Sequence, residues 1–170
     1  RFEFTLINKG TTAQSVGLQM TGDVLVDESC SSGFSYIPGY GYTYSSAVAN
    51  KPYPQLLTGN SIPAYFDTYD AVENPVVVAR NVLKLQDCTA PDALVLGEFS
   101  ELASASNWMP NDFAPDYLKP LNDLTWAVTW QPKALGAGGS RKIVTYYGVG
   151  AASSVWNYKS GTRLQQDHVC

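Results

Sequence analysis

Acidic side chains are the residues of this chain that come closest to a catalytic or metal-binding pattern. They gather in two short stretches, Asp23, Asp27 and Glu28 in the first and Asp67, Asp70 and Glu73 in the second. Glycoside hydrolysis requires two facing carboxyl groups, and calcium prefers oxygen ligands. Loop acids are ordinarily solvated, and the second stretch has no EF-hand loop. We interpret both stretches as solvated. The alternatives are a calcium site at Asp67, Asp70 and Glu73, and the acids of a polysaccharide-active enzyme.

The sequence offers few residues for nucleophilic catalysis or for zinc binding. The chain holds one histidine, His168, two residues before its last residue. Serine or cysteine nucleophiles need a rigidly held histidine, and zinc sites usually draw on several His or Cys ligands. Glycines near the tyrosines lack the helix and lysine of a phosphate-binding loop. We therefore expect no catalytic residues, no enzyme activity and no cofactor.

Tyrosines form the most suggestive binding pattern. Tyr36, Tyr40, Tyr42 and Tyr44 lie in a stretch rich in Gly, Ser and Pro, with little neighbouring bulk to cover them. Exposed aromatic side chains often mark interaction sites, and tyrosine gives contact area at a low cost in entropy. This loop is the predicted binding surface, for a protein or a sugar ring. The alternative is that the loop folds back and buries its tyrosines.

Three cysteines, Cys30, Cys88 and Cys170, show no metal-binding spacing. A Cys30–Cys88 disulfide would close a long loop and stabilise the fold by about 3–4 kcal/mol. Cys170 would then be unpaired or bonded to another chain. The alternative is three reduced, partly buried thiols.

The charge balance excludes one class of partner and suggests a compartment. Only 15% of the residues are charged, and 15 acids against 11 bases give a net charge of −4. The scattered bases do not form the basic cluster that nucleic-acid binding needs. No apolar run is long enough to span a bilayer, so we expect no membrane insertion within this segment. A low charge content with many polar uncharged residues favours an extracellular or cell-surface location.

Alternating apolar and polar residues must build the framework that positions these groups. The alternation is clearest over residues 1–8, 14–20, 124–130 and 142–149. Further short strands are expected over 64–69, 75–85, 91–99 and 155–158, with one or two helical turns over 100–107. About eight to ten short strands with long Tyr/Gly/Pro-rich loops predict an all-β antiparallel sandwich. It would be one domain spanning residues 1–170, as a full mature protein or a segment of a larger secreted one.

The two faces of the strand near residue 126 have different predicted environments. The pattern directs one set of side chains to the core, namely Leu124, Trp126, Val128 and Trp130. The other set points outward or toward a second layer, namely Thr125, Ala127 and Thr129. This strand therefore predicts the position of the core.

Two segments resemble β-sandwich modules of bacterial and archaeal cell-surface proteins. Residues 4–16, with Asn-Lys-Gly-Thr between two strands, are similar to the opening of Ig-like and galactose-mutarotase-like domains. Residues 130–144 resemble the glycine-rich turn before a late strand of those modules, with Ala137 where proline is common. The resemblance implies a large secreted or surface-anchored parent protein, and no catalytic motif accompanies it.

These observations lead to one expected function and one alternative. We expect a non-catalytic extracellular structural module of a surface protein, fibre or layer, which acts through self-association or contacts with other surface proteins. The alternative is a carbohydrate-binding module or a non-catalytic fragment of a polysaccharide-active enzyme, with glycans as partners.

Overall fold

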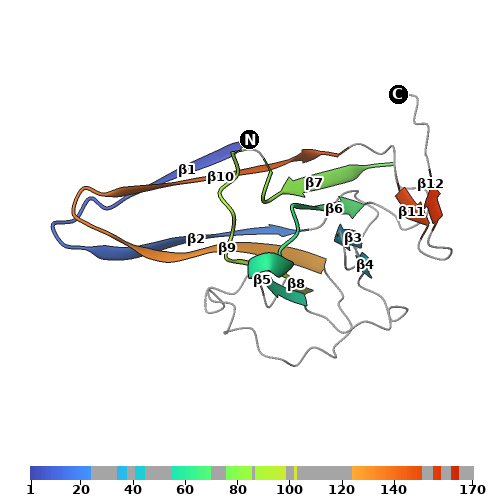
Figure 1. Cartoon of the computed structure of the whole chain (residues 1–170), viewed down its shortest axis with the longest axis horizontal. Coiled ribbons are helices and arrows are strands. Elements are labelled where there is room, and N and C mark those ends of the chain that lie inside the picture. The colour runs from blue at the N-terminus through green and yellow to red at the C-terminus, as the bar shows by residue number, and fades with distance from the viewer. Residues whose placement is uncertain are drawn as a thin grey trace.

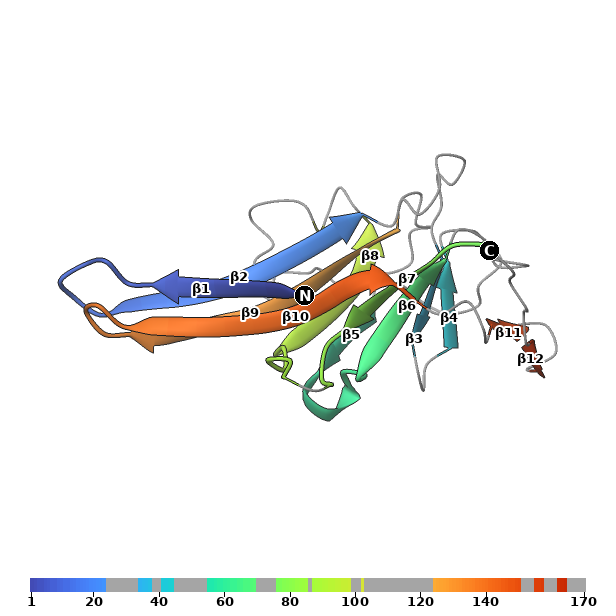
Figure 2. The same ribbon diagram turned by 90° about the horizontal axis from the view of Figure 1, so that it is seen from above.

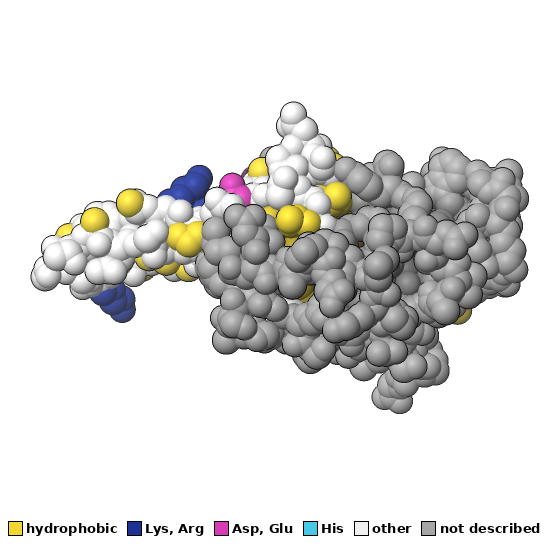
Figure 3. All heavy atoms as spheres, turned by 90° about the horizontal axis from the view of Figure 1, so that it is seen from below, with side chains coloured by type: hydrophobic (Ala, Val, Ile, Leu, Met, Phe, Trp, Pro, Cys, Tyr) yellow, Lys and Arg dark blue, Asp and Glu magenta, His cyan; other side chains and the backbone are white. Residues whose placement is uncertain are grey.

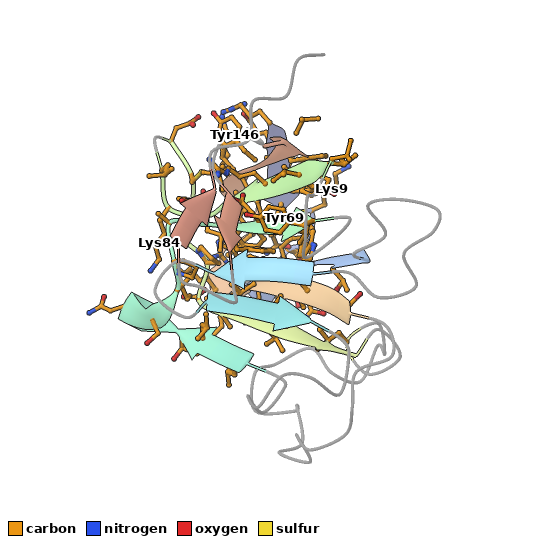
Figure 4. All side chains as sticks on the ribbon, turned by 90° about the vertical axis from the view of Figure 1, so that its right-hand side faces the viewer. Lys9, Tyr69, Lys84 and Tyr146 are labelled. Carbon is orange, nitrogen blue, oxygen red and sulfur yellow. The ribbon has the colours of Figure 1, made fainter. Side chains whose placement is uncertain are left out.

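The computed structural model describes residues 1–23, 34–37, 41–44, 55–69, 76–85, 87–98, 102, 124–150, 155–157 and 162–164. Two antiparallel sheets stack in layers (Figures 1 and 4). The six-stranded sheet has the order β1-β10-β7-β6-β3-β4, and the four-stranded sheet has the order β2-β9-β8-β5. This arrangement confirms the predicted all-β sandwich.

The strand bounds are as follows. The six-stranded sheet contains β1 (Phe2–Ile7), β10 (Ser140–Val149), β7 (Val78–Val82), β6 (Tyr65–Tyr69), β3 (Phe34–Ile37) and β4 (Gly41–Tyr44). The four-stranded sheet contains β2 (Gln14–Asp23), β9 (Leu124–Leu135), β8 (Ala93–Glu98) and β5 (Gln55–Thr58). A short 3₁₀ helix, η1 (Gly59–Ser61), follows β5, and β11 (Val155–Asn157) pairs with β12 (Thr162–Leu164).

The core lies between the two sheets and follows the predicted alternation. Trp126, Val128 and Trp130 of β9 pack with Phe66 of β6 and Ile143 of β10. Phe4 and Leu6, which alternate with polar residues along β1, pack against the same cluster. The opposite face of β9 is also buried, because Thr125, Ala127 and Thr129 are all 0% exposed. This face therefore does not point to solvent, and Ala127 packs there with Val95 and Leu102.

Two long ribbons, β1–β10 and β2–β9, extend away from the body and form an arm (Figures 1 and 2). Asn8 holds the tip of this arm together and is buried there. Its Nδ2 group donates to the carbonyls of Thr12 (2.8 Å), Leu135 (2.9 Å) and Gly136 (3.0 Å). Its Oδ1 accepts from the N–H of Gly10 at 2.9 Å. One side chain thus links the β1–β2 connection to the β9–β10 turn.

Several elements differ from their predicted bounds. The strand predicted over 75–85 is shorter, because the N–H groups of Leu83 and Lys84 both turn to the Ala64 carbonyl (2.8 and 3.1 Å). Strands β3, β5 and β12 were not predicted, since runs of three or four residues show too little alternation. The helical turns predicted over 100–107 lie outside the described residues except at Leu102, which is buried against Val95 and Ala127. Within the described part of the chain, no helix has the length and apolar character needed to cross a bilayer.

Candidate functional site

One side of the sandwich is open where the outer strands of the two sheets, β1 and β2, lie. The ladder between β1 and β10 ends with Phe2 opposite Thr145, whereas β10 continues to Val149 (Figure 2). Among the described residues, no strand continues the line of β1 beyond this point. Within the described residues, the last residues of β10 therefore pair with a strand on one side only, namely β7.

Hydrogen bonds of neighbouring residues show which backbone groups face away from β7. The N–H of Val144 donates to Thr89 Oγ1 (3.0 Å), and its carbonyl accepts from the Thr89 N–H (2.8 Å). The N–H of Gly150 donates to the Val78 carbonyl (2.7 Å), also on the side away from β1. Backbone groups of successive strand residues point to opposite sides. Tyr147 and Val149 therefore direct their N–H and C=O groups to the open side.

A pocket of about 230 Å³ lies between the two sheets beside these residues. Its lining residues are Phe2 of β1, Tyr147 of β10, Trp126 of β9 and Met20, Thr21 and Gly22 of β2. Gly22 is directly opposite Trp126 in the β2–β9 ladder, and a Cβ atom at Gly22 would lie 2.1 Å from Cζ2 of the indole. Only glycine therefore leaves room for the indole in this pocket wall.

Aromatic and apolar side chains surround the mouth of the pocket. Phe2 is 42% exposed, Tyr147 is 41% exposed and Val149 is 92% exposed. The ring centroids of Tyr147 and Trp126 lie 6.1 Å apart. Trp126 also packs edge-on against the buried Phe66, with 5.8 Å between the ring centroids. Exposed apolar groups beside a pocket are typical of an interaction site.

Charged groups on the outer side of the six-stranded sheet position the start of β1. Arg1 pairs with Glu3 at 2.6 Å and with Asp87 at 3.1 Å. The Tyr146 hydroxyl, on the same outer side (Figure 4), donates to Asp87 at 2.6 Å. The Tyr146 hydroxyl and the Arg1 guanidinium stabilise the carboxylate and hold the pKa of Asp87 below its usual value. Exposed pairs of this kind stabilise little, but they fix where the β1–β10 ladder begins.

Asn81 is a buried polar residue whose side chain has no hydrogen-bond partner among the described residues. It is 1% exposed, and neither its Oδ1 nor its Nδ2 has a partner. It lies opposite Tyr147 in the β10–β7 ladder and opposite Phe66 in the β6–β7 ladder. An unsatisfied buried amide costs about 1–3 kcal/mol. The free energy of unfolding is therefore lower than it would be with an apolar residue of similar size at position 81.

The predicted tyrosine surface falls partly on a short hairpin at the far edge of the six-stranded sheet. In the β3–β4 ladder Tyr36 is opposite Tyr42, and Tyr44 is opposite Phe34. Tyr40 lies outside the described residues. The tyrosine-based binding surface remains a prediction.

The predicted acidic stretches are only partly described. Asp67 is buried on β6, and its two oxygens accept hydrogen bonds from Nε and Nη2 of Arg80, both at 2.7 Å. The guanidinium also lies 4.2 Å from the centroid of the Tyr65 ring. A cation at Asp67 would compete with Arg80 for both oxygens. Asp70, Glu73, Asp27 and Glu28 lie outside the described residues, and Asp23 ends β2. The calcium site and the acid pair remain predictions.

The structure shows no disulfide at Cys88, so the predicted Cys30–Cys88 pairing is not seen. The thiol of Cys88 is free and lies 3.5 Å from the Val82 carbonyl, and partial burial raises its pKa. Cys30 and Cys170 lie outside the described residues. In the same described part, no group of three or more His, Cys, Asp or Glu side chains could hold a metal ion.

The sequence did not predict the pocket, although it placed one lining residue, Trp126, on the core face of its strand. Trp126 and Met20 belong to predicted apolar faces of their strands, and Phe2 and Tyr147 to alternating rows. The local pattern of residues does not specify which strands lie beside one another. The lining residues come together only through the register between strands that are far apart in the chain.

Comparison with protein-family models, with curated proteins and with solved structures finds no match to this chain. The resemblance to Ig-like and galactose-mutarotase-like surface modules therefore remains a prediction. The case for function depends on the geometry of the open side.

Proposed function

We propose that this chain is a non-catalytic extracellular structural module that acts through contacts with other copies or with partner proteins. The observation that carries the proposal is the open side of the sandwich. There the exposed side chains of Phe2, Tyr147 and Val149 lie at or near an apolar pocket. Covering exposed apolar groups with a partner is favourable because it removes them from water.

The distribution of charge supports an assembly role. Residues 4–22 and 124–149, which include most of the arm, contain Lys9, Lys133, Arg141 and Lys142 and no Asp or Glu. Lys142 forms an ion pair with Glu3 at the start of β1, so the other three bases carry the positive charge of the arm. Figure 3 shows Lys and Arg side chains on both sides of the arm. The other residues of the chain hold the remaining seven bases and all 15 acids. A positive arm and a negative remainder attract each other between copies, and salt weakens that attraction.

The first prediction concerns self-association. In sedimentation-velocity runs at low salt we expect concentration-dependent assembly, with and without reductant. Val149→Lys should weaken assembly by about tenfold or more, because Val149 is exposed and a charged side chain in its place would be costly to bury against a partner. Ile7→Lys is the matched control, since Ile7 is an exposed apolar residue near the arm tip. A protein that remains monomeric at high concentration in both redox states would contradict self-association.

A carbohydrate-binding module is the second candidate. The observation that favours it is the backbone register of the β3–β4 ladder, in which Tyr36 is opposite Tyr42. Binding on a glycan array that disappears in Tyr42→Ala would favour this function, and a glycan array without binding would exclude it for the sugars displayed.

A further inference from the structure

We propose that the Arg80–Asp67 pair on the outer face of the six-stranded sheet binds a neutral sugar, through the N–H groups of Arg80 that Asp67 does not use and beside the bare backbone of Gly148. The ligand would be a neutral oligosaccharide with neighbouring hydroxyl groups on one ring. The proposal rests on the second candidate function, carbohydrate binding, and names the polar part of that site and the class of sugar.

Strand alternation places this pair on the outer face. Phe66 of β6 belongs to the core between the sheets, so the next residue, Asp67, points outward. Arg80 is opposite Asp67 in the β6–β7 ladder, and Gly148 is opposite Arg80 in the β10–β7 ladder. Opposite residues of a ladder share a face. The three positions therefore form a row across the outer face.

Two contacts hold the guanidinium of Arg80 in place and leave one edge of it available. Its Nε and Nη2 groups donate to the two oxygens of Asp67, both at 2.7 Å, and its central carbon lies 4.2 Å from the centroid of the Tyr65 ring. A guanidinium has five N–H groups, and the remaining ones, on Nη1 and Nη2, have no acceptor among the described residues. The side chain is 35% exposed. A ligand in solution would therefore meet a fork of donors that is already oriented.

Gly148 leaves open space beside this fork. It is exposed, and a Cβ atom at this position would meet nothing within 4 Å. A side chain of β10 would otherwise stand here, next to Arg80. A shallow floor without side chains, beside oriented donors, suits a ring that lies on the sheet.

The charge of the pair favours a neutral ligand over an acidic one. The Asp67 carboxylate compensates the charge of Arg80. A carboxylate ligand at the fork would be attracted by the guanidinium and repelled by Asp67, which lies against the same group. Hydroxyl oxygens accept hydrogen bonds without that repulsion. The net charge of −4 also disfavours the binding of a polyanion.

Backbone register connects the pair with the tyrosines of the carbohydrate-binding candidate. Asp67 is opposite Tyr36 in the β3–β6 ladder, and Tyr36 is opposite Tyr42 in the β3–β4 ladder. One row of paired positions therefore runs across the sheet from Gly148 through Arg80 and Asp67 to the two tyrosines. A linear oligosaccharide laid across the strands would follow this row.

NMR titration tests the site with defined sugars. The probes are cellohexaose and mannohexaose as neutral oligosaccharides and hexagalacturonate as the acidic one. A neutral probe should shift the Nε–H signal of Arg80 and the amide signal of Gly148. Hexagalacturonate should bind about tenfold more weakly or not at all, because Asp67 repels it.

Two glycine variants separate the site from the rest of the surface. Gly148→Leu fills the floor beside Arg80 and should weaken binding of the neutral probe by about tenfold or more. Gly136→Leu is the matched control, because a Cβ atom at Gly136 also meets nothing within 4 Å and this residue lies at the arm tip. Urea denaturation checks that both variants stay folded. Arg80→Lys keeps a positive charge beside Asp67 but loses the fork, and should also lose binding.

The possible outcomes are distinct. Equal binding by the two glycine variants, tighter binding of hexagalacturonate, or no binding of either neutral probe at millimolar concentration would each overturn the site. A neutral probe that shifts only other residues would keep carbohydrate binding and reject this location. Self-association, the first proposed function, is measured separately by sedimentation and does not depend on this result.

Discussion

Asn8→Asp should lower the free energy of unfolding by about 3–5 kcal/mol, the range for an uncompensated buried charge. The amide of Asn8 donates to three carbonyls that come from both connections at the arm tip. A carboxylate there would face three carbonyl oxygens without a hydrogen to donate. Asn8→Ala should cost less, about 1–3 kcal/mol, because it leaves the carbonyls unsatisfied without adding charge. Urea denaturation measures both.

Gln14→Ala is the matched control for the arm tip. The Gln14 side chain is exposed and donates only to the Thr12 hydroxyl, at 3.3 Å. Surface changes of this kind usually alter stability by no more than about 0.5 kcal/mol. Equal effects of Asn8→Asp and Gln14→Ala would show that Asn8 does not hold the tip together.

Gly22→Ala should lower the free energy of unfolding by about 1–3 kcal/mol, the usual range for overpacking a core. The added methyl group would overlap Cζ2 and Cε2 of Trp126, at 2.1 and 2.2 Å. The indole would have to leave the pocket wall. Urea denaturation measures the loss of stability.

Two further variants test whether this overlap is the cause. Gly148→Ala should have little effect on stability, because a Cβ atom at Gly148 meets nothing within 4 Å. Trp126→Leu in the Gly22→Ala background should cost less than it does alone, since the smaller side chain makes room for the methyl group. Additive costs of the two substitutions would contradict the overlap.

Much of the framework could be predicted because strand faces are encoded locally. Phe4 and Leu6 pack inward as their alternation indicates, and Trp126, Val128 and Trp130 form the core. The turn at 136–139 lies at a glycine-rich stretch where Gly138 has φ 71°. Strands such as β5 were missed because four residues carry too little pattern. β5 becomes a strand by pairing with β8, whose residues lie 35 to 41 positions further along the chain.

Less of the candidate site could be predicted, since its parts meet only through long-range pairing. Gly22 leaves room for the indole because it is opposite Trp126 in the β2–β9 ladder. Tyr147 lines the pocket because β10 pairs with β1, which brings Phe2 close to it. Asp67 appeared in the sequence as a solvated loop acid or calcium ligand. In the structure it is buried and paired with Arg80, because the β6–β7 register places the two residues opposite each other.

The order of residues along the chain alone determined the fold class, the inward rows of the long strands and the turns between them. Those features depend on steric and hydrophobic preferences that act over a few neighbouring residues. The three-dimensional arrangement decided which strands share a sheet, where the β1–β10 ladder ends and which side chains enclose the pocket. Those features depend on hydrogen bonds and packing between segments more than a hundred residues apart, whose register no local pattern specifies.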